Sequence, residues 1–124
     1  MNIELKVAKI IEANDHPNAD RLVVLKVDAG ETEEKTLLTE YQYGSGDTVP
    51  ETETVPKYRQ IVAGIRKSYT NEQLVGKNIV LVCNLEPAVL RGVESQGMLL
   101  AASDEAGISV ISPDRDVKIG SKVK

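Results

Sequence analysis

The amino-acid sequence predicts an all-β domain, a small closed barrel of five strands with one short helix and a C-terminal extension. The chain has 124 residues, which is enough for one hydrophobic core but too few for two. Its hydrophobic fraction of 41% and charged fraction of 27% are typical of a globular protein. Short segments rich in Val, Ile and Leu recur along the sequence with only one good helix signal among them. These observations favour one folding unit over residues 1–124.

The first two strands are predicted at residues 5–12 and 22–28. Both segments are rich in Val, Ile and Leu, and apolar and polar side chains alternate from Val23 to Asp28, as in a half-buried strand. Residues 14–20 between them are dense in Asn, Asp and Pro, which favour turns, so a connecting loop is expected there. A third strand is expected to begin within residues 35–43.

Residues 43–56 combine Gly, Ser, Thr, Glu and Pro with few apolar side chains. Such a segment buries too little surface to offset the entropy cost of ordering it, so a mobile loop or a projecting hairpin is expected. It forms most of an acidic flexible insertion at about residues 33–57. Strand composition returns at residues 58–65, where residues 61–63 are expected to enter the core.

The single helix signal is a capping box that begins at Thr70. The Thr70 hydroxyl is expected to face the amide three residues on, and the Gln73 side chain is expected to reach back to the Thr70 backbone. Gly76 then supplies a C-terminal cap. The sequence therefore predicts a helix of barely two turns.

Three apolar segments follow the helix and are predicted to be strands, at residues 79–83, 97–102 and 108–111. Residues 119–124 fit either a tail strand or a frayed end. A helix between the third and fourth strands of a five-stranded barrel is the order found in the oligonucleotide-binding (OB) barrel. The sequence therefore predicts this kind of barrel.

The charge balance is unfavourable for nucleic-acid binding when it is taken as a whole. Fifteen basic and 19 acidic residues give a net charge of −4. Residues 31–58, however, hold two basic and seven acidic residues, a balance of −5, so the rest of the chain carries +1. One acidic segment thus accounts for more than the whole excess, and the position of the other charges becomes the important question.

Groups for catalysis or metal binding are scarce. A nucleophile needs a base held by a third group, and His16 is the only histidine. The lone Cys83 can form no internal disulfide, one Cys with one His is too few for a zinc site, and a small buried hydrophobe is the expected role of Cys83. The Gly-flanked Ser45 lies in a segment without the lysine of a phosphate loop. We therefore expect no enzyme, no cofactor and no metal.

Nothing in the sequence resembles a membrane or export segment. No stretch approaches the roughly 20 uninterrupted apolar residues of a membrane helix. The first residues lack a basic region followed by an apolar one. The expected protein is soluble and cytoplasmic and has no contact with a membrane.

Polar side chains gather between two apolar strands, within residues 84–103. Arg91, Ser95 and Gln96 lie there beside two glycines, so hydrogen-bonding groups are concentrated where a ligand can approach the backbone closely. Two interpretations remain open. The segment is either a loop that binds a ligand or a tight connection whose polar groups satisfy its own backbone.

Four motifs occur in order along the chain: His-Pro-Asn-Ala-Asp-Arg-Leu at 16–22, Ala-Gly-Ile-Arg-Lys-Ser-Tyr at 63–69, Asn-Leu-Glu-Pro at 84–87, and Leu-Arg-Gly-Val-Glu-Ser-Gln-Gly-Met-Leu-Leu-Ala-Ala-Ser at 90–103. From about residue 5 to residue 124 the chain resembles the tRNA-binding domain family, which includes stand-alone proteins and the module appended to methionyl-tRNA synthetase. The resemblance implies an OB barrel that holds the outside of tRNA, often as a dimer, and supplies affinity rather than catalysis.

The resemblance also assigns candidate tRNA-binding residues. The Ser-x-Gly-Met element of the family matches residues 95–98, and several of its basic positions are basic here. The full candidate set is Lys9, Arg21, Arg66, Lys67, Asn84, Arg91, Ser95, Gln96 and Met98. The cations are expected to contact phosphates, Ser95 and Gln96 to bond sugar hydroxyls or base edges, and Met98 to pack on an exposed base.

Two departures from the family pattern are expected to weaken binding. Val89 stands where relatives commonly carry lysine, and the segment at residues 33–57 is longer and more acidic than usual. The chain has no Phe or Trp and only four Tyr, so platforms that stack several bases are poorly supplied. Recognition of folded RNA by its shape fits this composition better.

The leading hypothesis is a non-catalytic tRNA-binding module, free-standing or serving methionyl-tRNA synthetase as an accessory β subunit, and homodimeric. Residues 108–111 and the tail after residue 112 are candidate dimer segments. The alternative is a chaperone-like or protein-interaction module on the same fold. The leading hypothesis requires the cations to lie together along one side of the barrel.

Overall fold

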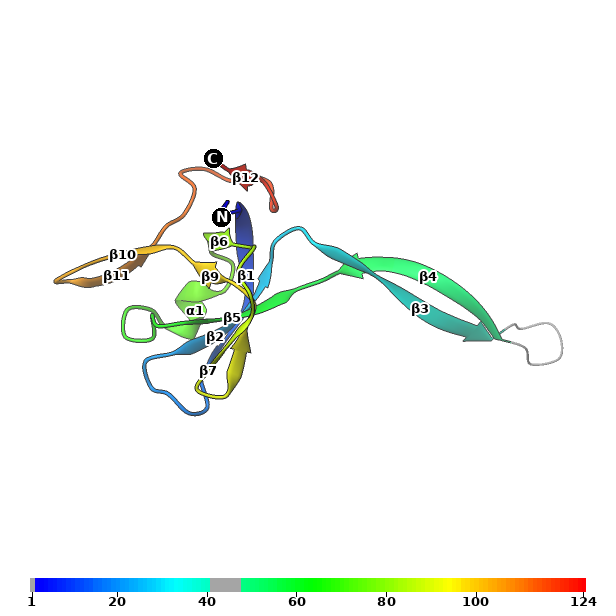
Figure 1. Ribbon diagram of the computed structural model, residues 1–124, viewed down its shortest axis with the longest axis horizontal. Helices are drawn as coiled ribbons and strands as arrows, with labels where there is room; N and C mark the ends of the chain where they lie inside the picture. The colour runs from blue at the N-terminus through cyan, green and yellow to red at the C-terminus, as the bar shows by residue number, and fades with distance from the viewer. Residues whose placement is uncertain (1, 41–47) are drawn as a thin grey trace.

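The computed structural model describes residues 2–40 and 48–124 (Figure 1). The Gly-flanked Ser45 and the rings of Tyr41 and Tyr43 lie outside the described residues. The elements are β1 (Leu5–Asp15), β2 (Val23–Asp28), β3 (Thr32–Glu40), β4 (Thr48–Pro56), β5 (Arg59–Ala63), α1 (Asn71–Leu74), β6 (Asn78–Val82), β7 (Ala88–Leu90), β8 (Val93–Ser95), β9 (Met98–Leu99), β10 (Ala101–Asp104), β11 (Gly107–Val110) and β12 (Lys122–Val123).

Six strands form one antiparallel sheet, five of them in the order β5-β2-β1-β6-β9 and the sixth, β12, paired with β1, and this sheet curls into a nearly closed barrel (Figure 1). Its inward-facing side chains are apolar and make the core, as Ile10, Leu25, Ile61, Ile79 and Leu81 are fully buried. The prediction of an all-β OB barrel with one short helix is therefore confirmed. Residues 61–63 lie in the core, also as predicted.

Strand β1 serves both halves of the barrel. Its first part pairs with β6 and its second part pairs with β2, and the register shifts between Ile10 and Glu12. The extra residue of such a bulge bends the strand, so one strand can follow the curvature of the barrel. Ile11, at the shift, is partly exposed although its neighbour Ile10 is fully buried.

The barrel closes between β5 and the turn that follows β8 through hydrogen bonds from side chains. Ser95 Oγ accepts from the Val62 amide at 3.0 Å, and Gln96 Oε1 accepts from the Gln60 amide at 2.9 Å. The Gln96 amide in turn donates to the Gln60 carbonyl at 2.7 Å. Two side chains thus satisfy backbone donors on the edge of β5, which would otherwise remain open.

Helix α1 has the predicted capping box but is shorter than predicted. The Thr70 hydroxyl accepts from the Gln73 amide at 3.2 Å, and Gln73 Oε1 accepts from the Thr70 amide at 2.8 Å. The helix has four residues and not two turns, because Val75 is already extended and the Gly76 amide, at φ +87°, turns to donate to the Ile10 carbonyl. In the described part of the chain no helix is long and apolar enough to cross a membrane.

The segment after β6 contains a hairpin that the sequence did not predict. Strands β7 and β8 pair through a two-residue turn in which Arg91 and Gly92 have φ of 53° and 90°. Two successive positive φ values define the type I′ turn, which matches the twist of the flanking strands. The polar bend is therefore an ordered hairpin that places Arg91 at its tip.

The predicted strand at residues 97–102 is divided in two. β9 pairs with β6 inside the barrel, whereas β10 leaves the barrel and pairs only with β11 among the described strands. The division falls at Leu100. Its amide donates to the Val80 carbonyl, and its carbonyl accepts from the Ile111 amide. A second hairpin thus projects from the barrel near the loop that follows β5 (Figure 1).

Strands β3 and β4 form a long hairpin, called the arm below, that projects from the opposite side of the barrel (Figure 1). Each strand has nine residues, about 30 Å at the usual rise per residue. Of the two predicted forms, a mobile loop or a projecting hairpin, the described backbone shows the hairpin. At its base the Lys57 amide bonds the Glu31 carbonyl.

The C-terminal extension returns to the barrel and ends as a strand. β12 pairs with the beginning of β1, and the Gly120 amide donates to the Val7 carbonyl at 2.8 Å. Gly30 and Gly120 lie so close that a Cβ on Gly30 would stand 3.0 Å from Gly120 Cα. Of the two forms expected for the tail, the structure shows the strand.

Candidate nucleic-acid interface

Two of the predicted cations share one hollow at the end of the barrel. Arg21, in the loop between β1 and β2, and Arg91, at the tip of the β7–β8 hairpin, line a hollow of about 380 Å³ together with Ala19, Asp20 and Leu22. Both arginines are exposed. Segments 70 residues apart in the chain thus bring two guanidinium groups to one place.

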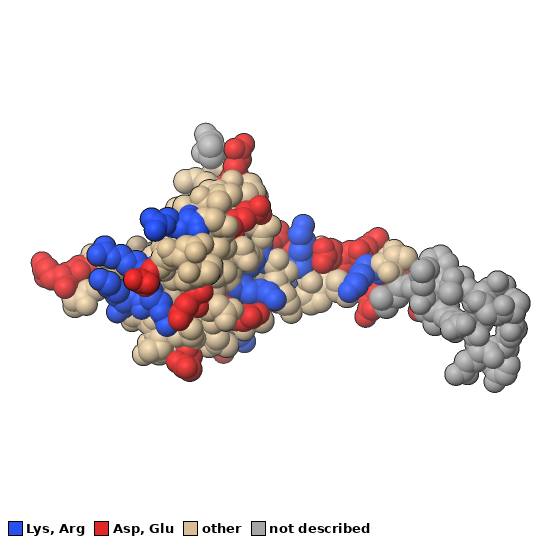
Figure 2. Space-filling view, turned by 90° about the horizontal axis from the view of Figure 1, so that it is seen from below, with Lys and Arg blue, Asp and Glu red and all other residues tan. Residues whose placement is uncertain are grey.

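Lys67 lies on the same flank, beside the β10–β11 hairpin. It is exposed and lines a hollow whose other walls include Ser68, Asp104 and Ile108. The hairpin is fixed to this loop because the Ile108 amide donates to Ser68 Oγ and the Val110 amide donates to Tyr69 Oη, each at 3.0 Å. Figure 2 shows several Lys and Arg side chains on this flank with acidic side chains among them, and both acidic and basic side chains along the arm.

Arg66 lies next to these cations, but its charge is already matched. Its guanidinium lies 2.8 Å from Asp15 Oδ1 and donates to Asn71 Oδ1 at 2.7 Å. Its backbone amide bonds the Arg21 carbonyl at 3.3 Å. Arg66 therefore ties the end of β1, the β1–β2 loop and the start of α1 together, which holds Arg21 in place.

Lys9 and Asn84 are not brought to this flank. Lys9 lies in the middle of β1, paired with Asp28 and Asn78, six residues or about 20 Å from the Asp15 end of the strand. The Asn84 side chain holds the N-terminal segment, since its Oδ1 accepts from the Glu4 amide and its Nδ2 donates to the Asn2 carbonyl.

Ser95 and Gln96 use their polar groups inside the protein. Ser95 is 5% exposed, and its hydroxyl accepts from Val62 and donates to the Gly97 carbonyl at 2.9 Å. Gln96 bonds the backbone of Gln60. Of the two interpretations of this segment, these two residues fit the one in which polar groups satisfy the backbone, while Arg91 is exposed and has no ion-pair partner among the described residues.

Met98 is 56% exposed and lies on the rim of an apolar groove of about 430 Å³. The groove runs between the β7–β8 hairpin and the β10–β11 hairpin. Its lining is almost entirely apolar: Leu22, Val62, Ala63, Gly64, Ile65, Leu90, Met98, Leu99, Ala101, Ala102, Ser103 and Ile108. The Met98 side chain is therefore available for contact with a ligand.

His16 and Asn18 position Arg91, a role that the sequence did not reveal. The buried imidazole of His16 accepts from the Asn18 amide at Nδ1 and donates from Nε2 to the Leu90 carbonyl, both at 2.9 Å. These partners require the neutral ring with its proton on Nε2. Asn18 Nδ2 donates to the Arg91 carbonyl at 3.2 Å, and the Arg91 guanidinium donates to the Asn18 carbonyl at 3.4 Å. Because Leu90 and Arg91 are more than 70 residues away from His16 and Asn18, no local pattern could identify this role.

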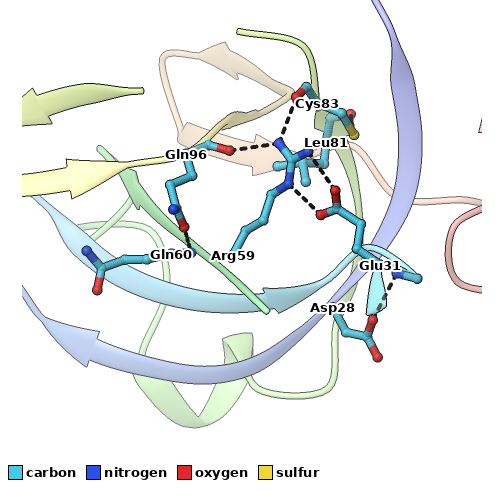
Figure 3. Close-up of polar contacts among 8 residues, drawn as sticks. Asp28, Glu31, Arg59, Gln60, Leu81, Cys83 and Gln96 are labelled. Carbon is cyan, nitrogen blue, oxygen red and sulfur yellow. Dashed lines mark hydrogen bonds and ion pairs between the residues drawn. The ribbon is translucent and has the colours of Figure 1, made fainter. Parts of the chain in front are cut away.

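Arg59 joins four parts of the barrel and was also missed. Its guanidinium forms two bonds with the Glu31 carboxylate, at 2.6 and 2.9 Å, and donates to the carbonyls of Cys83 and Gln96 at 2.7 and 2.9 Å (Figure 3). These bonds hold the pKa of Glu31 below its ordinary value and raise the pKa of Arg59. Burial raises the pKa of the nearby Cys83 thiol, as expected for a small buried hydrophobe.

The Glu31–Arg59 pair predicts a pH-dependent stability. Because folding lowers the pKa of Glu31 below 4.5, the pair contributes its full stability above about pH 4.5 and loses it as the pH falls through the folded-state value. The free energy of unfolding of the parent is expected to exceed that of Glu31→Gln at pH 7, and the difference is expected to shrink below pH 4.5. Urea titrations of both proteins between pH 7 and pH 3 measure it. A difference that stays constant over this range would contradict the prediction.

The chain matches the family model described as "Putative tRNA binding domain" over residues 5–43 and 51–122. The chain belongs to this family. The match leaves out residues 44–50, and both matched segments extend into the acidic stretch at residues 33–57.

Curated relatives and solved structures agree with this assignment. The chain is 44% identical to methionine–tRNA ligase of Thermococcus kodakarensis over 122 residues and 45% identical to that of Methanococcus aeolicus over 121, in each case over 98% of this chain. It spans only 13% and 14% of the length of these relatives. A protein from Pyrococcus horikoshii related to methionyl-tRNA synthetase has the same fold, with a TM-score of 0.72, 29% identity and coverage of 98% of this chain and 90% of that one.

A chaperone shares the fold as well. The CsaA chaperone protein of Picrophilus torridus aligns with a TM-score of 0.73 at 22% identity. The alignment covers 99% of this chain and 92% of the chaperone chain. Identity this low establishes the common fold and nothing about a common function.

Proposed function

We propose that this protein is a non-catalytic module that binds the outside of folded tRNA through the flank formed by Arg21, Arg91 and Lys67. The observation that carries the proposal is the convergence of these three exposed cations from three separate segments. Among the residues that the structure describes, none of the three takes part in an ion pair. Free cations on one flank of a tRNA-binding family member suit contacts with phosphates, which position RNA without reading its sequence.

The acidic net charge does not oppose this proposal. The excess acids belong to the arm and its base, and the arm projects from the side of the barrel opposite the β10–β11 hairpin (Figures 1 and 2). The Debye length is about 8 Å at physiological ionic strength, so salt screens most of the arm's charge from the cations across the barrel. RNA that approaches this flank therefore meets Arg21, Arg91 and Lys67 together with the local carboxylates of Asp20 and Asp104, while the charge of the arm is largely screened.

The relatives indicate the setting in which such a module acts. The matched segment is a small part of a methionine–tRNA ligase, and we infer that this chain likewise increases the tRNA affinity of methionyl-tRNA synthetase, as a free-standing protein or an accessory subunit. The module itself supplies affinity and no chemical step. Association into a homodimer would double the number of cationic flanks available to one RNA.

A filter-binding titration with tRNA at 50 to 200 mM salt tests the proposal. Arg21→Glu, Arg91→Glu and Lys67→Glu are each expected to weaken binding by about tenfold and to reduce the slope of log affinity against log salt by roughly 0.7 to 0.9. Lys35→Glu on the arm is the charge-matched control and is expected to stay within about twofold of the parent. Lys9→Glu, about 20 Å along β1 from the end that holds the cations, should behave like the control.

The proposal fails if the parent does not bind tRNA even at 50 mM salt, where electrostatic attraction is strongest. If Lys35→Glu and Arg91→Glu reduced the tRNA affinity equally, the RNA would be attracted by overall charge and not by a defined flank. Sedimentation of the free protein tests the dimer separately, because a monomer would remove that part of the proposal and leave the RNA contact intact.

The second candidate is a protein-interaction module, and the apolar groove beside Met98 is the observation in its favour. A chaperone would use such a groove for apolar segments of an unfolded chain. Competition separates the two candidates. If an unfolded polypeptide displaces tRNA and binds more tightly than tRNA at physiological salt, the second candidate replaces the first.

A further inference from the structure

Three hollows neighbour one another along the cationic flank. The apolar groove shares Leu22 with the hollow of Arg21 and Arg91, and it shares Ile108 with the hollow of Lys67. The groove therefore has the guanidinium groups of Arg21 and Arg91 on one side, where Asp20 also lies, and the ammonium group of Lys67 on the other, where Asp104 also lies.

The groove has the chemistry of a site for a flat, weakly polar group. Buried Val62, Ala63 and Leu99 form its floor, and the partly exposed Leu90 and Met98 stand on its rim. Its volume of about 430 Å³ lies within the range of small-molecule sites. The Met98 thioether can contact the edge of an aromatic ring favourably.

Polar groups for the edge of such a ring are also present. Residues 101–103 of β10 line the groove in succession, and among the described strands β10 pairs with β11 alone. The other edge of β10 therefore presents backbone amides and carbonyls, and the exposed Ser103 adds a hydroxyl. These groups can bond the donor and acceptor edge of a nucleobase.

We propose that the groove receives one unstacked nucleobase of the bound RNA, with phosphates of the same strand at Arg21 and Arg91 on one side and at Lys67 on the other. The inference rests on the proposed function and specifies it, since it places a single-stranded, splayed-out nucleotide at this flank. None of the residues that line the groove is aromatic, so burial in an apolar slot takes the place of stacking on a ring.

Filling the groove without touching a charge tests this inference. Ala102→Leu adds bulk to an exposed residue that lines the groove, and Ala88→Leu makes the same change on an exposed residue of β7 that does not line it. In tRNA titrations Ala102→Leu is expected to weaken binding by about tenfold with an unchanged salt slope, because a base contact is lost and no phosphate contact is lost. Ala88→Leu is expected to stay within about twofold of the parent.

A second titration tests the base itself, with a short single-stranded oligoribonucleotide and an abasic oligomer that has the same number of phosphates. The parent is expected to bind the first about tenfold more tightly, and Ala102→Leu is expected to bind both alike. Binding of both oligomers with equal affinity by the parent would overturn the inference.

Two further outcomes would also overturn it. One is tRNA binding by Ala102→Leu as strong as that of the parent, which would leave the proposed tRNA function standing. The other is a parent dimer that Ala102→Leu converts to a monomer in sedimentation, which would show that a second copy of the chain covers the groove. A parent that binds no tRNA is a different failure, that of the proposed function.

Discussion

Replacing Arg59 with methionine is expected to lower the free energy of unfolding by about 3 kcal/mol. The guanidinium makes two bonds to the Glu31 carboxylate and one each to the Cys83 and Gln96 carbonyls, and its side chain is only 19% exposed. Methionine fills similar volume but leaves a partly buried carboxylate and two carbonyls without this donor. The loss is larger than for a surface pair because little water can replace the missing bonds.

Urea unfolding at pH 7 of the parent, Arg59→Met, Glu31→Gln and the double variant measures this effect. The coupling free energy between the two residues should be favourable and at least about 1 kcal/mol. Lys26→Met is the matched control, since it removes an exposed pair with Glu12 and should change stability by no more than about 1 kcal/mol. Equal losses for Lys26→Met and Arg59→Met would show that Arg59 does not fasten the barrel.

Replacing His16 with alanine is expected to weaken tRNA binding by about as much as Arg91→Ala does, roughly tenfold, and to lower the free energy of unfolding by about 2 kcal/mol. The buried imidazole satisfies the Asn18 amide and the Leu90 carbonyl, and its loss leaves both without their partner. The β7–β8 hairpin is then no longer held to the β1–β2 loop, so Arg91 and Arg21 lose their common alignment.

A double-mutant cycle in the tRNA titration separates positioning from general destabilisation. If His16 acts through Arg91, then His16→Ala has almost no further effect on affinity in the Arg91→Ala background. His16→Gln is expected to restore much of the affinity, since its amide can still donate to the Leu90 carbonyl. Fully additive losses, or equal affinities for His16→Gln and His16→Ala, would contradict a positioning role.

Local sequence patterns were sufficient for the barrel strands and the helix cap. Alternation at residues 23–28, the apolar run at residues 79–83 and the Thr70–Gln73 box depend on neighbours in the chain, and the structure places a strand or a cap at each. Local patterns failed where a partner was distant. The β7–β8 hairpin and the division between β9 and β10 depend on contacts with other strands, so the sequence indicated a loop and one continuous strand.

The candidate site shows the same limit. Its residue types and motifs identified the right region, and Arg21, Arg91, Lys67 and Met98 do lie on one flank around the groove. The motifs could not separate groups that face solvent from groups that bond the protein. The side chains of Ser95 and Gln96 bond the backbone of β5. The guanidinium of Arg66 bonds the side chains of Asp15 and Asn71. Lys9 and Asn84 lie elsewhere on the barrel.

The sequence by itself determined that this protein is a small β-barrel of the tRNA-binding family, because apolar periodicity, turn residues and the order of motifs can be read from the sequence without knowledge of contacts between distant residues. Only the tertiary structure decided which polar groups remain free to bind a ligand and that an apolar groove lies between the cations. The physical reason is that a hydrogen bond or a hollow depends on distances between residues far apart in sequence, and folding sets those distances.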